Sequence, residues 1–390
     1  MGHLRMGWAP LRPLVILGAT GSIGRQTVEV ADRIGAPIAA LAARTPSEAL
    51  LKLGMAHPEA IVCVVEPGDD AAVFRSAFGN RAHFGKGAMT EVAAMRGATV
   101  VNGVVGSAGL EASLSALYAG NRLALANKES LVAGGSLIRA ALDNNGGELI
   151  PVDSEHSAIW QCIVGEERSS LRRVILTASG GPFRGFSAQD LESVTVEQAL
   201  AHPTWAMGPR ITTDSATLMN KAFEVIEAHY LFEIPYDQID VVVHPQSIVH
   251  SFVEFTDGVV KAEVGFPDMR KPIQAAVTYP DRVAVAHEPF DIVGTDLSFE
   301  KPDTATFPCL SLGYEAGRIG GTATAVLNAA DEVAVAAFLD GRLPFSAIAS
   351  VVSTVLDAHE PREPGSVEDV ADADSWARRA ARTECESVTG

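Results

Sequence analysis

Residues 14–24 place the strongest constraint on how this chain can fold. An apolar run over 14–17 is followed by Gly18-Ala19-Thr20-Gly21-Ser22-Ile23-Gly24 and then by a helical pattern over 25–34. Glycines between a strand and a helix let the backbone approach a pyrophosphate and leave amides of the helix N-terminus pointing at it. Any tight strand-to-helix turn also favours glycine, so the turn alone does not identify a nucleotide site.

Strand and helix patterns alternate after this turn. Further strand-like runs cover 38–42, 60–65, 99–101 and 122–125. Such alternation predicts a Rossmann-like, doubly wound parallel sheet with its ligand crevice at the carboxyl ends of the strands. Arg44 follows the second strand, where the adenosine ribose would lie, and a basic side chain there favours NADP over NAD. The alternative for Arg44 is a solvated surface arginine.

A second feature is the pair of carboxylates in Asp153-Ser154-Glu155, which follows an apolar run at 149–150 and precedes a helical pattern. One interpretation is helix capping, with Asp153 or Ser154 at the N-cap and Glu155 in the first turn. The other is a metal site, because a bend at the end of a strand lets both carboxylates converge on one cation. All-oxygen ligation would favour Mg²⁺ or Mn²⁺ over zinc.

The pattern over 216–232 predicts a helix that Asp214 or Ser215 would cap. Asn220, Lys221 and Glu224 lie on one face of it. A surface ion pair between Lys221 and Glu224 is one interpretation, and a phosphate site with a metal ligand is the other.

The rest of the chain predicts architecture and a lid. Residues 202–210 combine hinge residues with a tryptophan and a methionine, which is typical of a lid that excludes water, or of a loop that packs its tryptophan into the core. Strands over 248–255 and 259–264 form a predicted hairpin that could serve as a dimer surface. Residues 280–308 look irregular, and 309–318, 322–339 and 345–359 look helical.

The composition limits the partners. The formal net charge is −18, whereas nucleic-acid binding needs a basic face, so no nucleic-acid partner is expected. Hydrophobic residues make up 47% of the chain, but no apolar run approaches the roughly 20 residues of a membrane span. An anionic substrate must therefore be met by a few local cations.

Two features predict a cytoplasmic protein. Residues 1–10 lack the apolar core of a secretory signal and are interpreted as a loose leader. The cysteines are far apart and form no CxxC pair, which favours buried thiols in a reducing compartment over a zinc site. They are Cys63, Cys162, Cys309 and Cys385.

Six motifs in a fixed order resemble the 1-deoxy-D-xylulose 5-phosphate (DXP) reductoisomerase family. They lie at 18–24, 125–129, 151–156, 179–184, 215–224 and 244–247, and the resemblance extends from about Leu14 to Phe345. It implies rearrangement of DXP, a small phosphorylated sugar, and reduction of the resulting aldehyde by NADPH to 2-C-methyl-D-erythritol 4-phosphate, a step of isoprenoid synthesis. NADPH, Mg²⁺ or Mn²⁺, and a homodimer are implied with it.

The resemblance also implies roles for individual residues. The implied metal ligands are Asp153, Glu155 and Glu224, which with Lys128 and His202 make the catalytic set. The implied substrate contacts are Lys128, Ser154, Glu155, His202 and Glu224, with Ser179, Ser215, Asn220 and Lys221 on the phosphate and Trp205 and Met207 as the cover of the lid. The implied NADPH contacts are Thr20, Gly21, Ser22, Ile23, Arg44, Asn127, Glu129 and Gly208.

The implied domains are an NADPH-binding domain (1–150), a central α/β catalytic and dimerisation domain (151–283) with a mobile lid (200–212), a linker (284–308) and a C-terminal helical domain (309–390). The chain departs from the pattern of the family in three places. Ala43 and Thr45 replace a usual Gly and Asn around Arg44, Ala222 replaces a common glycine, and Asp331 replaces a usual asparagine.

Two other functions remain open at this point. A metal-independent NADP dehydrogenase of the semialdehyde or homoserine type has a similar glycine turn, but it would leave the three carboxylates without a role. An NADP-binding sensor without turnover would not need the acids together with Lys128 and Lys221.

Overall fold

The computed structural model describes residues 10–106, 108–205, 207–284 and 289–389. The predicted leader therefore lies almost entirely outside the described residues, as do Ala206 of the lid and residues 285–288 of the linker. The chain divides into two compact units. The first contains residues up to 127, 140–154 and 268–288, and the second contains 128–139, 155–267 and 289 onwards.

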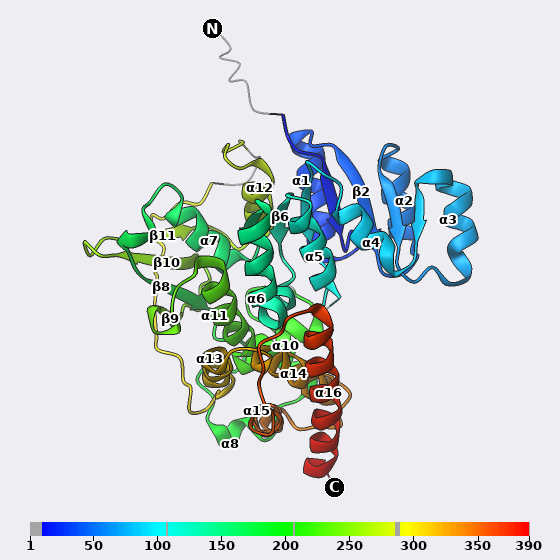
Figure 1. Ribbon diagram of the computed structural model, residues 1–390. Coiled ribbons are helices and arrows are strands. Elements are labelled where there is room, and N and C mark those ends of the chain that lie inside the picture. The colour runs from blue at the N-terminus through cyan, green and yellow to red at the C-terminus, as the bar shows by residue number, and fades with distance from the viewer. Residues whose placement is uncertain (1–9, 107, 206, 285–288, 390) are drawn as a thin grey trace. The chain divides into compact units, whose positions relative to one another are not determined.

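A seven-stranded parallel sheet forms the centre of the first unit (Figure 1, blue to cyan). In spatial order its strands are β4 (Ala82–Phe84), β3 (Ile61–Val64), β2 (Ile38–Ala43), β1 (Leu14–Leu17), β5 (Thr99–Asn102), β6 (Arg122–Leu125) and β7 (Glu148–Pro151). The order reverses between β1 and β5, and a doubly wound sheet binds ligands at the carboxyl ends of the strands at such a point. The predicted parallel doubly wound sheet is confirmed.

Helices connect and cover these strands, because a buried parallel sheet needs apolar cover on both faces. They are α1 (Ser22–Ile34), α2 (Glu48–Ala56), α3 (Ala71–Phe78), α4 (Lys86–Ala93), α5 (Gly109–Tyr118) and α12 (Arg270–Thr278). Helix α12 comes from a distant part of the sequence and packs on α1. Helix α6 (Lys128–Asn145) begins in the second unit and ends in the first.

The second unit is built on a four-stranded mixed sheet. Its strands lie in the order β11 (Val260–Val264), β10 (Val249–Phe255), β8 (Leu171–Ala178) and β9 (Ile239–Val243). Strands β8 and β9 are parallel, and β10 runs antiparallel to β8 and β11. The predicted β10–β11 hairpin is confirmed, and β11 forms an edge of the sheet.

The helices of the second unit carry most of the candidate site. They are α7 (Ser154–Ile163), α8 (Ala188–Leu191), α9 (Val196–Ala199), α10 (Pro209–Thr217), α11 (Met219–Phe232), α13 (Cys309–Ile319), α14 (Ala323–Leu339), α15 (Ile348–Asp357) and α16 (Val367–Thr389). The C-terminal helices α13 to α16 lie together, with α14 packed against α13, α15 and α16 (Figure 1, orange to red).

The prediction of one helix over 216–232, capped by Asp214 or Ser215, is wrong. Two helices occupy this stretch, α10 and α11, and they are separated at Leu218, whose φ is 63°. Helix α10 begins earlier because Gly208 stands at its N-cap and Pro209 at its first position, where a proline is well tolerated. Asp214 and Ser215 consequently lie inside α10.

The sequence pattern missed several short or charged elements, namely β4, α12 and α16. Helix α16 has a mean hydropathy too low for the pattern of a core helix, yet it buries one apolar stripe. All four cysteines are buried, as predicted. Within the described residues, no helix is both long enough and apolar enough to cross a membrane.

Candidate active site

Three carboxylates converge where β7 passes into α7. Asp153 directly precedes α7, Glu155 lies in its first turn, and Glu224 lies in α11. One oxygen from each lies within 4.8 Å of the others. Glu224 is buried and the other two are half-buried. A set of three carboxylate oxygens is the chemistry that suits Mg²⁺ or Mn²⁺.

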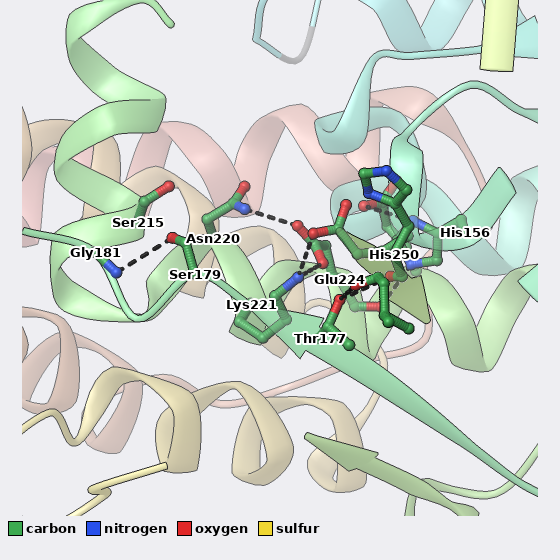
Figure 2. A network of polar contacts seen from close by, with 12 residues as sticks. His156, Thr177, Ser179, Gly181, Ser215, Asn220, Lys221, Glu224 and His250 are labelled. Carbon is green, nitrogen blue, oxygen red and sulfur yellow. Dashed lines mark hydrogen bonds and ion pairs between the residues drawn. The ribbon is translucent and has the colours of Figure 1, made fainter. Parts of the chain in front are cut away.

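Two ammonium groups contact these acids, that of the buried Lys221 (Figure 2) and that of the half-buried Lys128. Lys221 Nζ donates to Glu155 Oε1 at 2.9 Å and to Glu224 Oε2. Lys128 Nζ lies 3.4 Å from Glu224 Oε1, and Asn220 Nδ2 donates to the same oxygen at 2.7 Å. Lys221 is 3% exposed and Glu224 is 1% exposed, so the interpretation of this pair as a surface ion pair is wrong.

Ser179 and His202 form a second polar group. The backbone N–H groups of Thr204 and Trp205 donate to His202 Nδ1 at 3.1 and 2.9 Å, so the proton of the neutral ring lies on Nε2. Nε2 donates to Ser179 Oγ at 2.9 Å, and the Gly181 N–H donates to the same oxygen at 3.2 Å. Burial lowers the pKa of His202, which favours this neutral form. The Ser179 hydroxyl proton is then directed to a further acceptor.

The other predicted substrate contacts are more dispersed. Ser154 is the first residue of α7, and the Ser215 hydroxyl donates to Ile211 O at 2.8 Å within α10. Trp205 is half-buried, with its ring 6.3 Å from the His250 ring. Met207 is also half-buried. Trp205 is therefore neither fully exposed nor fully packed into the core. Its burial is intermediate between the two interpretations, a lid and a loop that packs its tryptophan into the core.

The glycine turn lies at the reversal point of the large sheet, within the first unit. Gly18 has a φ of 79°, and a Cβ on it would come within 2.6 Å of Gly103 O, in the loop after β5. A Cβ on Gly24 would lie 2.3 Å from Gly18 O, so the turn needs glycine at both positions. No side chain caps α1 at Gly21. The N–H groups at the start of α1, in the segment Thr20 to Ile23, are thus placed for an anion.

The remaining predicted NADPH contacts have different environments. The Arg44 side chain is 79% exposed, and its Nε lies 3.0 Å from Glu66 Oε2. Asn127 is buried and donates to Val104 O and Gly106 O at 2.8 and 3.0 Å, which fixes the loop after β5. In the second unit, Glu129 lies 2.9 Å from Arg210 Nη1, and Gly208 is the N-cap of α10.

Sequence reasoning missed two charged residues near these groups, the buried Glu227 and the half-buried Arg210. Glu227 lies one turn after Glu224 on α11, and its carboxylate is 3.2 Å from Lys128 Nζ. Arg210 contacts Glu129, Glu332 and Asn328 at 2.7 to 2.9 Å. The spacing of three residues between Glu224 and Glu227 puts them on one helical face and was the available signal.

His244, in the motif at 244–247, makes two backbone contacts and has a structural role. Its Nδ1 lies 2.8 Å from Ser298 O, and its Nε2 accepts from the Ile248 N–H at 3.2 Å. The ring therefore ties β9 and β10 to the chain around Ser298 and has no place among the candidate ligands.

Family models for DXP reductoisomerase match most of the chain. The model described as 1-deoxy-D-xylulose 5-phosphate reductoisomerase matches residues 14–135. The model for the C-terminal domain of that enzyme matches 149–232, and a second C-terminal model, described as DXP reductoisomerase C-terminal domain, matches 264–380.

Curated relatives agree over nearly the full length. The chain is 49% identical over 384 residues to the 1-deoxy-D-xylulose 5-phosphate reductoisomerase of Beutenbergia cavernae, covering 95% of this chain and 96% of the relative. It is 46% identical over 375 residues to the enzyme of that name from Pelotomaculum thermopropionicum, covering 94% and 97%.

Solved structures share the fold. The reductoisomerase of Zymomonas mobilis, in complex with NADPH, superposes with a TM-score of 0.90 at 40% identity and covers 97% of this chain and 100% of its own. A DOX-P reductoisomerase in complex with NADPH, fosmidomycin and magnesium gives a TM-score of 0.90 at 36% identity, covering 97% and 99%. This chain therefore belongs to the 1-deoxy-D-xylulose 5-phosphate reductoisomerase family.

Proposed function

We propose that this protein is a 1-deoxy-D-xylulose 5-phosphate reductoisomerase. It rearranges DXP and reduces the resulting aldehyde with NADPH to 2-C-methyl-D-erythritol 4-phosphate, in the non-mevalonate route to isoprenoids. The observation that carries the proposal is the convergence of Asp153, Glu155 and Glu224 beside the ammonium groups of two lysines, in a chain of this family.

Asp153, Glu155 and Glu224 would hold Mg²⁺ or Mn²⁺, which their three converging carboxylate oxygens fit. When bound, the cation supplies Lewis-acid stabilisation of the negative charge that develops on the hydroxyketone oxygens of the substrate. Lys128 would donate hydrogen bonds to the same oxygens, since its ammonium is held 3.4 Å from Glu224 Oε1. Ser154, at the start of α7, would orient the hydroxyketone.

The phosphate of the substrate would be held by Ser179, Ser215, Asn220 and Lys221. Ser179 is prepared for this role because its oxygen already accepts two hydrogen bonds and its proton can point to a phosphate oxygen. Lys221 would supply the local positive charge that a protein with a net charge of −18 otherwise lacks. His202 would hold the Ser179 hydroxyl in place and would also contact the substrate. Trp205 and Met207 would cover the bound substrate.

NADPH would bind at the glycine turn of the first unit. When bound, it supplies the hydride that reduces the aldehyde. The amides over Thr20, Gly21, Ser22 and Ile23 would hold its pyrophosphate, and Arg44 would face the 2′-phosphate. The exposure of Arg44 and its pairing with Glu66 support this role, since an exposed guanidinium can take a second anionic partner. Asn127, Glu129 and Gly208 would complete the NADPH contacts, Asn127 by fixing the loop after β5.

A homodimer is also proposed. Strand β11 is an edge of the four-stranded sheet, and Val259 and Val260 are each 51% exposed there. Exposed apolar side chains at the edge of a sheet form a surface that another chain can cover. Sedimentation equilibrium should give about twice the mass of one chain, and a monomer at micromolar concentration would contradict the proposal.

A cytoplasmic location is proposed with it. The four cysteines are buried free thiols. They support a reducing compartment, because cysteines in oxidising compartments usually form disulfides. Cell fractionation should recover the protein with cytoplasmic markers.

One assay tests the main proposal: NADPH oxidation by the purified chain with DXP, with and without Mg²⁺ or Mn²⁺. Turnover should require DXP and metal and should stop with EDTA. Absence of turnover in the presence of metal would overturn the proposal. Turnover that EDTA leaves unchanged would point to a metal-independent dehydrogenase, for which no structural observation speaks.

A further inference from the structure

Glu227 is a buried carboxylate in the candidate site that has no role in the proposed function. It is 4% exposed, and its Oε2 lies 3.2 Å from Lys128 Nζ. The same ammonium lies 3.4 Å from Glu224 Oε1. Lys128, whose side chain is 12% exposed, is therefore held between two carboxylates that lie one turn apart on α11.

The two carboxylates that hold Lys128 differ in their other contacts. Glu224 also accepts from Lys221 and Asn220, and it belongs to the group whose oxygens converge with Asp153 and Glu155. An oxygen that coordinates a divalent cation loses most of its attraction for an ammonium, and the cation repels that ammonium. Once a cation occupies the three carboxylates, Glu224 can no longer be the main partner of Lys128.

The charges of the cluster lead to the same conclusion. The cluster contains four carboxylates, those of Asp153, Glu155, Glu224 and Glu227. Their negative charges balance the positive charges of the two ammonium groups and one divalent cation. Without Glu227 the cation-loaded cluster would hold an excess positive charge in a buried place, which is costly. His156 faces the cluster as well, with Nδ1 3.8 Å from Glu227 Oε2 and Nε2 2.9 Å from Glu224 O.

We propose that Glu227 is a positioning residue, which keeps the Lys128 ammonium at the substrate when the cation takes Glu224. The inference rests on the proposed function, because that function gives Lys128 its contact with the hydroxyketone. Glu227 acts through Lys128 and touches neither the substrate nor NADPH.

The test compares Glu227→Gln with Glu233→Gln in the full-length protein. Glu233 follows α11 and is the matched control, because its carboxylate also pairs with cationic side chains, those of Arg139 and Arg168, but its side chain is 48% exposed. Glu227→Gln should lower kcat and weaken Mn²⁺ binding by about 10- to 100-fold, the range typical of losing a charged partner just outside the ligands of a metal site. The dissociation constant of NADPH should not change. The number of Mn²⁺ ions bound per chain, measured by electron paramagnetic resonance, should not change either. Glu233→Gln should behave like the unaltered protein.

A double-mutant cycle tests whether the effect passes through Lys128. In a Lys128→Gln background, adding Glu227→Gln should cause little further loss of kcat, because the group that Glu227 holds is already absent. Glu227→Asp keeps the charge on a shorter side chain and should give an intermediate kcat, and it replaces Glu227→Gln in the cycle if the glutamine variant does not fold.

Three outcomes would overturn the inference. They are an activity of Glu227→Gln equal to that of Glu233→Gln, a full additional loss in the double variant, and the loss of one bound Mn²⁺ per chain, which would make Glu227 a metal ligand. Inactivity of the unaltered protein with DXP and metal would overturn the proposed function instead, so the two failures are distinguishable.

Discussion

The Lys221 ammonium lies 2.9 Å from Glu155 Oε1 and also contacts Glu224, so it joins two of the three carboxylates proposed to bind a divalent cation. A buried ammonium in this place lowers the repulsion between the acids when no cation is bound. A cation bound by these acids would compete with Lys221 for their oxygens and so favour release of its ammonium. The released ammonium would be available to the substrate phosphate, which links metal binding to phosphate binding through one side chain.

Glu224→Gln should remove the metal dependence of the enzyme. The neutral amide is a weak ligand for a hard cation and leaves both lysines with one carboxylate fewer. The metal-dependent kcat should fall by about 100-fold or more, since the cation supplies several kcal/mol of transition-state stabilisation. NADPH affinity, measured by fluorescence titration, should stay nearly unchanged.

Glu233→Gln is the control for this variant as well, because it makes the same chemical change at an exposed ion pair at the end of α11. A Glu224→Gln protein with full activity and an unchanged response to Mn²⁺ would refute the assignment of Glu224 as a ligand.

Arg44→Asp should erode the preference for NADPH over NADH. The change removes the guanidinium proposed to face the 2′-phosphate and places a carboxylate beside Glu66, so the ratio of kcat/KM for the two cofactors should fall by about 10- to 100-fold. Lys52→Asp is the control, because its side chain is similarly exposed, at 74%, and lies on the adjacent helix α2. An unchanged ratio would show that another group recognises the 2′-phosphate.

The sequence predicted the nucleotide-binding sheet well because its signals are local. Apolar runs bounded by turns define β1, β2, β5 and β6, and the glycines of the turn after β1 are required by contacts that the structure shows at Gly18 and Gly24. Where the pattern failed, another local effect prevailed. The positive φ of Leu218 divides a continuous apolar pattern into α10 and α11, and a sequence pattern does not report backbone dihedrals.

The candidate site was only partly predictable for a different reason. Asp153 and Glu155 are neighbours in sequence, but their convergence with Glu224 depends on tertiary packing, and it was expected only because the motifs resemble one family. Glu227 and Arg210 were missed because charged residues on an amphipathic helix usually face solvent. In this protein, the buried Glu227 faces Lys128, and the half-buried Arg210 faces Glu129.

Gly24→Ala should weaken NADPH binding by disturbing the turn after β1. The new methyl group would lie 2.3 Å from Gly18 O and 2.5 Å from the Ala19 Cα, both backbone atoms that cannot move aside cheaply. The turn should shift, at a cost of about 1–3 kcal/mol in the free energy of unfolding. Gly87→Ala on α4 is the control, since nothing lies within 4 Å of its added Cβ. Equal NADPH affinities in the two variants would contradict this account of the turn.

The interior of the second unit also holds two acids in unusual surroundings, Asp214 of α10 and Asp331 of α14, which are 4% and 0% exposed. Burial, and then the charge of Asp214, raise the pKa of Asp331 well above its ordinary value, and burial raises the pKa of Asp214 to about 6. Arg210 opposes both shifts from 3.6 and 3.7 Å. The other charged or titratable groups that face the pair are Glu129, Glu332 and the Cys309 thiol.

Asp331→Asn should therefore stabilise the protein at neutral pH and have little effect near pH 4. A carboxyl whose folded pKa is raised binds a proton that the unfolded chain has released, so its presence lowers the stability as the pH rises from about 4 through the folded pKa. The neutral asparagine removes this loss. At pH 7 the free energy of unfolding should rise, because the asparagine removes the cost of ionising a carboxyl whose pKa burial raises. Urea unfolding between pH 4 and 8 measures the effect, and Asp340→Asn, at an exposed side chain after the same helix, is the control. A stability gain that is the same at every pH, or a loss at pH 7, would show that Asp331 is ionised and stabilised in the folded protein.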